Sequence, residues 1–215
     1  MEPQMILTIV LAVIACVVVG IVYYRLVTKE RSGQQHAGAV NAAPGDDTPY
    51  SDRGANGAFL RRLRTAAARR DVAMLVTDPA KTPFAALIVG PHGVTAVYAV
   101  DYDGTIYGGS DEEWVQMKDG VRRTFENPLR AAETARRALR ETINQGNFRP
   151  FMIDARVVMT APKAELAIPR GVSYYTPKTF AAYVQDSPDL ANDRRVDQEA
   201  LKAFLQEHFC GERTA

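Results

Sequence analysis

An uncharged apolar segment near the start of the chain restricts where this protein can reside. Residues 5–24, MILTIVLAVIACVVVGIVYY, contain no charged side chain. A helix of about 20 residues is about 30 Å long, which matches the hydrocarbon core of a bilayer. Tyr23 and Tyr24 end the run, where interfacial aromatic side chains are common. The segment predicts a single transmembrane helix, and we assign residues 1–28 to this anchor.

The charges that flank the segment predict its direction. Arg25, Lys29 and Arg31 follow the apolar run, whereas the residues before it, MEPQ, include no basic side chain. Because basic residues collect on the cytoplasmic side, we expect a single-pass protein of the cell membrane with its N-terminus outside and its C-terminal domain in the cytoplasm. The acidic flank and the length of the run argue against a secretory signal. The sequence VIAC at residues 13–16 resembles a bacterial lipobox, but apolar residues follow Cys16 and argue against lipidation.

Composition separates a linker from a folded domain. Residues 29–53 are rich in Gly, Ala, Ser, Pro, Asp and Asn, which is typical of a flexible linker. Residues 54–215 carry apolar patterns of helical and strand period and form the expected domain. The chain has a formal net charge of +1, which is not the charge of a dedicated nucleic-acid binder. Its two cysteines, Cys16 and Cys210, offer no disulfide framework and are compatible with a reducing compartment.

The domain is expected to begin with an amphipathic helix that has a basic face. Phe59, Leu60, Leu63, Ala66 and Ala67 share one side at helical spacing. The arginines lie largely on the other side, which is either a solvated helix surface or a contact patch for anionic lipid or nucleic acid. This candidate patch consists of Arg61, Arg62, Arg64, Arg69 and Arg70.

The remaining segments predict an α/β domain. Asn127 and Pro128 are typical of a helix start, and this helix should run to about Asn144. Two further helices are expected at residues 178–185 and 197–209. Helices and strands in this order predict a sheet with helices on its faces. The predicted strands, from β-prone runs bounded by turn residues, are residues 72–76, 85–89, 94–101, 105–107, 114–118, 121–125, 152–160 and 172–175.

Taken in order, several of these segments resemble the nuclease-related domain family, over about residues 54–161. The family implies a restriction-endonuclease-like fold, a mixed sheet flanked by helices, which is preceded here by a single transmembrane helix. The residues that carry the resemblance are Gly54 and Gly57, LIVGPHGV at 87–94, a strand that ends in DG at 103–104, Trp114, FENPLRAAETARRAL at 125–139 and MIDARVVMT at 152–160.

The resemblance also implies where catalytic residues should stand. Nucleases of this kind hold a divalent cation between carboxylates and use a lysine to stabilise charge at the phosphate. The family pattern places a Glu on the first helix, an Asp before the GP turn, a Glu-x-Lys pair on the next strand and a Gln near the start of the Asn-Pro helix. Here those positions hold Ala58, Ala85, Tyr98 with Val100, and Ala131. The resemblance therefore implies a degenerate member with no catalytic residues, metal or cofactor.

Other acidic residues leave a relocated metal site open as an alternative. Two of them lie two residues apart at the end of a predicted strand, but DYDG is also ordinary turn chemistry and SDEE an ordinary solvated loop. The hydroxyl of Tyr98 could bind a ligand, although a core tyrosine is the simpler interpretation. The acidic residues are Asp78, Asp101, Asp103, Asp111, Glu112 and Glu113.

Three functions are compatible with this sequence. The first is a membrane-tethered, catalytically inactive nuclease-like domain that acts as a protein-interaction module or accessory subunit of a membrane complex. Its expected partners are the lipid bilayer and other membrane proteins, and nucleic acid is not expected. The second is a membrane-anchored nuclease or DNA-binding protein, which the arginine patch favours and the missing carboxylates oppose. The third is a small-molecule or lipid sensor in the vacated cleft, for which the sequence offers no motif.

Overall fold

The computed structural model describes residues 49–52, 54–70, 72–109, 113–150, 152–190 and 197–210. The chain divides into two units, Met1–Pro44 and Gly45–Ala215, and the second contains every described residue. The predicted transmembrane segment and most of the predicted linker lie outside the described residues. Within those residues, every helix is too short or too polar to cross a bilayer.

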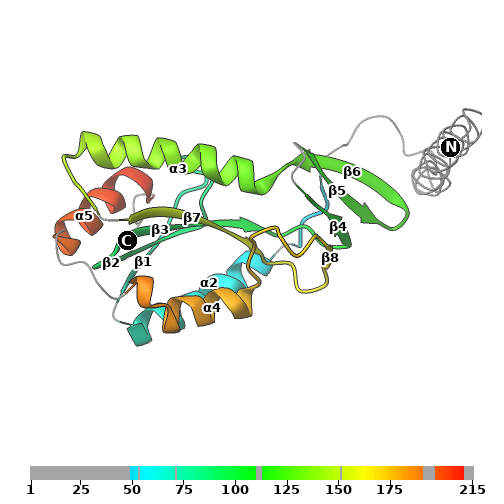
Figure 1. Ribbon diagram of the computed structural model, residues 1–215, viewed down its shortest axis with the longest axis horizontal. Coiled ribbons are helices and arrows are strands. Elements are labelled where there is room, and N and C mark those ends of the chain that lie inside the picture. Colours follow the sequence, from blue (N-terminus) through cyan, green and yellow to red (C-terminus); the bar gives the residue numbers. More distant parts are fainter. Residues whose placement is uncertain are drawn as a thin grey trace, which may run out of the picture. The chain divides into compact units, whose positions relative to one another are not determined.

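Two four-stranded sheets form the framework of the described domain (Figure 1). The first has the order β1-β2-β3-β7, and the second has the order β6-β5-β4-β8. Both sheets are mixed, because β3 pairs in parallel with β7 and β4 pairs in parallel with β8. The predicted mixed α/β architecture is confirmed, with its strands divided between two sheets. The strands are β1 (Ala73–Val76), β2 (Ala86–Gly90), β3 (Gly93–Val100), β4 (Thr105–Tyr107), β5 (Glu113–Lys118), β6 (Val121–Glu126), β7 (Met152–Met159) and β8 (Glu165–Ala167).

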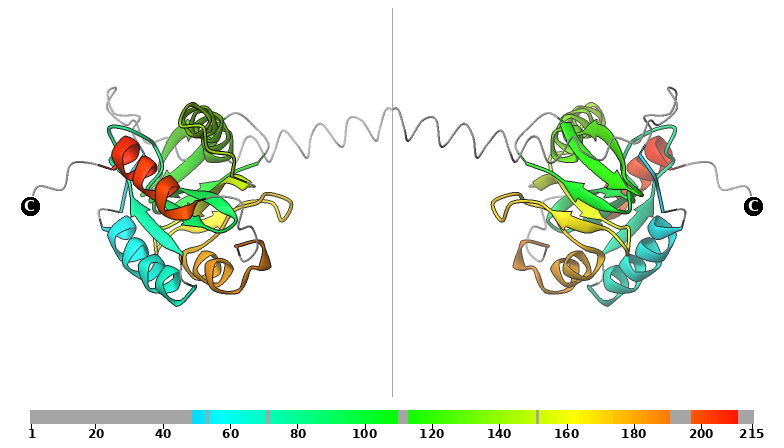
Figure 2. Two further views of the ribbon diagram at one scale, coloured as in Figure 1. Left: turned by 90° about the vertical axis from the view of Figure 1, so that its left-hand side faces the viewer. Right: turned by 90° about the vertical axis from the view of Figure 1, so that its right-hand side faces the viewer.

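Helices cover both faces of the first sheet (Figures 1 and 2). On one face lie α2 (Ala55–Arg70) and α4 (Pro177–Asp186), which is followed by the short 3-10 helix η1 (Pro188–Leu190). On the other face lie α3 (Pro128–Gln145) and α5 (Gln198–Phe209). Because successive side chains of a strand point to opposite faces, Val97 packs toward α2 and α4 while Val94 and Ala96 pack toward α3 and α5. Burial on both faces explains the nearly continuous apolar sequence of β3.

Local sequence signals set the helix starts. The Asn127 side chain accepts a hydrogen bond from the Leu129 N–H at 2.9 Å, and Pro128 occupies the first helical position. Thr176 and Thr179 form a capping box at the start of α4. These side chains satisfy amide groups that the first turn of a helix leaves without partners. The predicted start of α3 is therefore confirmed, together with its cap.

The strand prediction at residues 172–175 is wrong. Within this segment, Tyr175 forms an isolated bridge with Val158, and its ring packs against Phe180 and Tyr183. Tyr175 therefore packs against α4, whereas Val172 and Tyr174 pack against the cluster that contains Val100 and Trp114. β8 was not predicted from the sequence; its three residues lie between Pro162 and Pro169 and pair with β4.

The last residues of the predicted linker are bound to the domain. The buried Gln116 amide donates hydrogen bonds to the Tyr50 carbonyl at 2.9 Å and to the Asp103 carbonyl at 2.7 Å. The Gln116 side-chain oxygen accepts from the Tyr50 N–H at 2.8 Å, and the Asp52 N–H donates to the Asp101 carbonyl at 2.7 Å. The folded domain thus includes residues 50–52, which the sequence analysis assigned to the linker.

We predict that Gly93 cannot be replaced without a large loss of stability. Gly93 has a φ of +122°, and a Cβ atom there would collide with the Met152 carbonyl oxygen of the neighbouring strand. Gly93→Ala should lower the free energy of unfolding by about 3 kcal/mol or more. Gly120→Ala is the matched control, because Gly120 has a φ of +77° with open space around it. The control should lose about 1 kcal/mol. If urea unfolding gave the same loss of unfolding free energy for both variants, the steric role of Gly93 would be contradicted.

Candidate functional site

Tyr98 and Val100 lie on the face of β3 that α3 covers. Val100 is buried in an apolar cluster with Trp114 and Val157. Tyr98 is half-buried, and its ring meets Phe84 edge-on at a centroid distance of 6.4 Å. Burial is the largest cause that raises the pKa of the Tyr98 phenol, and the charges of Tyr102 and Glu126 raise it further. A neutral phenol among apolar neighbours packs this part of the strand and supplies no metal-binding carboxylate.

Ala85 and Ala131 contribute backbone contacts and methyl groups. The Ala85 N–H donates to the Val97 carbonyl at 2.8 Å, which holds the residue beside β3. In the first turn of α3, the Ala131 N–H donates to the Asn127 carbonyl at 3.0 Å. The structure therefore places Ala85 beside β3 and Ala131 in the first turn of α3, and neither side chain offers a charged or amide group.

The two acidic residues at the end of β3 have structural partners. The Asp103 carboxylate forms an ion pair with the Lys118 ammonium at 2.9 Å. The Asp101 carboxylate accepts a hydrogen bond from the Ser51 hydroxyl at 2.5 Å. The first contact joins the loop after β3 to β5, and the second joins that loop to the chain before α2. Each of these two carboxylates therefore has a structural role in the domain.

The other acidic candidates are scattered. Asp78 accepts a hydrogen bond from the Ala80 N–H at 2.9 Å, as a turn residue does, and Glu113 is exposed at the start of β5. Asp111 and Glu112 lie outside the described residues. Among the residues that are described, no three His, Cys, Asp or Glu side chains are grouped so that they could hold a metal ion. The relocated metal site therefore gains no support from this part of the chain.

The predicted arginine patch divides into two parts. Arg70 is half-buried, and its guanidinium donates to the Gln185 and Ser187 carbonyls, each at 3.0 Å. Arg70 therefore links α2 to the end of α4. Because these segments are far apart in the sequence, no local sequence pattern predicts this contact. The other four residues are exposed and form what we term the α2 arginine face, namely Arg61, Arg62, Arg64 and Arg69.

A charged pair on β7 was missed by the sequence analysis. Asp154 and Arg156 are two residues apart, so strand alternation puts them on one face, and their side chains form an ion pair at 2.6 Å. The Arg156 guanidinium also lies 5.5 Å from the Tyr183 ring centroid and 5.9 Å from that of Tyr175. The spacing resembles the carboxylate and cation of a nuclease strand, and it could have been found as Asp-x-Arg within MIDARVVMT. Because the arginine binds its own carboxylate and two rings, the pair links β7 to α4.

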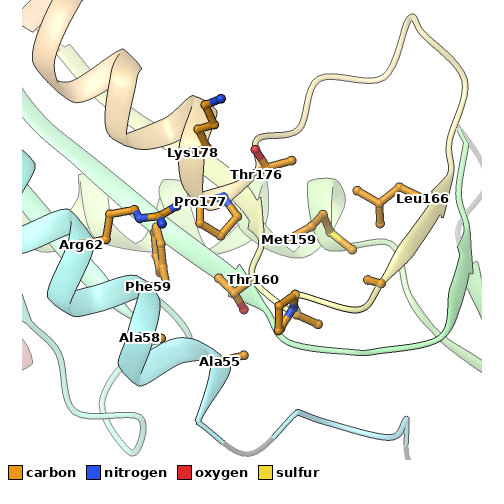
Figure 3. Close-up of a pocket in the computed structure, with 13 residues that line it drawn as sticks. Ala55, Ala58, Phe59, Arg62, Met159, Thr160, Leu166, Thr176, Pro177 and Lys178 are labelled. Carbon is orange, nitrogen blue, oxygen red and sulfur yellow. The ribbon is translucent and has the colours of Figure 1, made fainter.

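A pocket of about 410 Å³ opens between the starts of α2 and α4 and the segment after β7 (Figure 3). Of the five positions that the family resemblance singled out, Ala58 lines this pocket. Most of its walls are apolar, and two basic side chains stand at its edge. The lining residues are Ala55, Ala58, Phe59, Arg62, Met159, Thr160, Ala161, Pro162, Ala164, Leu166, Thr176, Pro177 and Lys178.

Comparison with known proteins agrees with the fold. Two mixed sheets flanked by helices define an α/β domain, and residues 75–160 match the family model of the nuclease-related domain, which supports a nuclease-like fold. The matched segment runs from β1 to the end of β7, so it contains Tyr98, Val100, Ala85 and Ala131 but neither Ala58 nor the α2 arginine face. A nuclease-related domain is therefore found in this chain. No curated protein and no solved structure matches the chain.

We predict that Tyr98 serves packing. Within the described residues its hydroxyl forms no hydrogen bond, so Tyr98→Phe should change the free energy of unfolding by less than about 0.5 kcal/mol. Tyr98→Glu should cost about 2 to 3 kcal/mol at pH 7, because it places a carboxylate in a half-buried site near Glu126.

The loss in Tyr98→Glu should depend on pH. Burial and the charge of Glu126 would raise the pKa of the new carboxyl above its unfolded value of about 4.3. The stability of the variant should therefore fall as pH rises from the unfolded pKa through the raised pKa of the folded state. The loss of unfolding free energy relative to the unaltered protein should be smaller at pH 4 than at pH 7. Denaturation at both pH values measures this difference, and a loss of the same size at both would contradict the packing role.

Proposed function

We propose that the protein is a membrane-tethered, catalytically inactive nuclease-like domain that acts as a protein-interaction module or as an accessory subunit of a membrane complex. The observation that carries this proposal is the packing of β3. Tyr98 and Val100 lie in apolar clusters at the positions where the family resemblance implies a carboxylate and a lysine. A folded domain without this chemistry is expected to act through its surface.

The uncharged segment at residues 5–24 supports the membrane tether, and the basic residues after it support a cytoplasmic domain. Since residues 50–52 are bound to the domain, the tether comprises about 25 residues. A flexible chain of that length has a root-mean-square reach of about 25 to 30 Å. It would hold the domain just beneath the bilayer and raise its effective concentration toward other membrane proteins.

A membrane-anchored DNA-binding protein is the second candidate. The four exposed side chains of the α2 arginine face favour it, because α2 carries no acidic residue to offset them. Phosphate contacts of this kind make DNA binding depend steeply on salt. The formal net charge of +1 for the whole chain opposes this candidate.

We predict that removal of the tether and neutralisation of the arginines have different effects. Deletion of residues 1–24 should reduce partner recovery from cross-linked membranes about tenfold or more, because the effective concentration is lost. The triple variant Arg61→Gln, Arg62→Gln, Arg69→Gln should retain most of that recovery. The lysine triple variant at the same positions is the matched control, because it keeps the charge. The measurement is quantitative mass spectrometry of proteins that co-purify with each variant.

For a DNA-binding protein, neutralisation of the arginines should reduce binding more than deletion of the tether does. Binding of each variant to duplex DNA across a salt series tests this directly. Tight DNA binding that is lost in the glutamine triple variant and survives both in the lysine control and in the tether deletion would refute the interaction module.

A further inference from the structure

The pocket at the starts of α2 and α4 has a charge distribution of its own. Arg62 comes from α2 and Lys178 from the first turn of α4, and Figure 3 shows Arg62 extending toward Pro177 from the facing helix. Among the described residues, neither basic side chain forms an ion pair or a hydrogen bond. No acidic side chain lines the pocket. Two exposed cations therefore stand at the edge of one cavity without a carboxylate to balance them.

The interior of the pocket is apolar. Phe59, Met159, Leu166 and Pro177 provide most of the larger side chains of its walls. The polar groups deeper in the pocket are engaged, since the buried Thr160 hydroxyl hydrogen-bonds to the Asn56 side chain at 2.8 Å. A ligand would therefore find apolar surface inside and positive charge at the rim.

The size of the pocket restricts the ligand further. A volume of about 410 Å³ lies within the range of about 300 to 1,000 Å³ that is common for small-molecule sites. The cavity is too small for a nucleic-acid strand or a folded partner. Arg62 and Lys178 both line the pocket, and a charge-assisted contact with either would be stronger than a neutral one.

We propose that this pocket binds a small soluble organic anion, with an aromatic or short alkyl body among the apolar walls and a phosphate or carboxylate group at Arg62 and Lys178. The positive ends of two helix dipoles reinforce the same field, because both α2 and α4 begin at the pocket. This inference goes beyond the proposed function and does not depend on it, since it requires neither a membrane nor a partner protein.

The test uses the full chain in nanodiscs of phosphatidylcholine and phenyl phosphate as the probe, followed by ligand-observed NMR. Phenyl phosphate should bind saturably, and both benzyl alcohol and inorganic phosphate should bind about tenfold more weakly, because each lacks one of the two features. Arg62→Gln and Lys178→Gln should each weaken binding about threefold to tenfold. Ala58→Glu should abolish binding by adding a carboxylate to the wall.

Arg64→Gln is the matched control, because Arg64 is an exposed arginine of the same helix that does not line the pocket. Its affinity for phenyl phosphate should stay within about twofold of the unaltered protein. Thermal unfolding of each variant verifies the fold, and because Arg62 and Lys178 come from different helices, either variant suffices if the other is unstable. An equal loss in Arg64→Gln would show a diffuse surface field and overturn the site. Absence of saturable phenyl phosphate binding to the protein in phosphatidylcholine nanodiscs would overturn it as well.

Discussion

The parallel pairing of β3 with β7 is the constraint on which the rest of the domain depends. Eight consecutive residue pairs join the two strands, from Gly93 with Met152 to Val100 with Met159. Parallel neighbours require a crossover connection, so the chain must leave the first sheet after β3 and return to it at β7. On the way it forms β4, β5 and β6 of the second sheet, and then α3, which covers one face of the first sheet (Figure 1). The first pair of this register is possible because Gly93 has no Cβ atom that would collide with the Met152 carbonyl oxygen.

The same pairing decides what β3 can offer chemically. Both of its faces are covered, one by α2 and α4 and the other by α3 and α5, so its side chains must fill space. Tyr98 and Val100 do so at the positions that the resemblance associates with catalysis. The groups left free for recognition lie on the surface, where the α2 arginine face and the pocket beside Ala58 present positive charge. These surfaces support the proposal that the domain acts by binding.

Local patterns predicted most of the helices and strands, because caps, turns and apolar periodicity act over a few residues. Asn127 and Pro128 defined the start of α3 in this way. Long-range contacts could not be predicted: Arg70 binds carbonyls more than a hundred residues away, and Gln116 holds Tyr50 across 66 positions of sequence. The three residues of β8 carry too short a pattern to reveal a strand. For the candidate site, the replacement of catalytic positions stays a prediction from the family resemblance, whereas the pocket at Ala58 depends on the packing of α2 against α4 and has no local sequence pattern.

The most direct test of the central claim is a nuclease assay on the full chain. With magnesium or manganese and either duplex DNA or RNA, we expect no cleavage above that of a buffer control, because a catalytic metal requires converging carboxylates. The positions at which the family resemblance implies catalytic groups hold Ala58, Ala85, Tyr98, Val100 and Ala131 instead. Robust metal-dependent nicking that Asp101→Asn or Asp103→Asn abolishes would contradict the claim and establish a relocated active site at the end of β3.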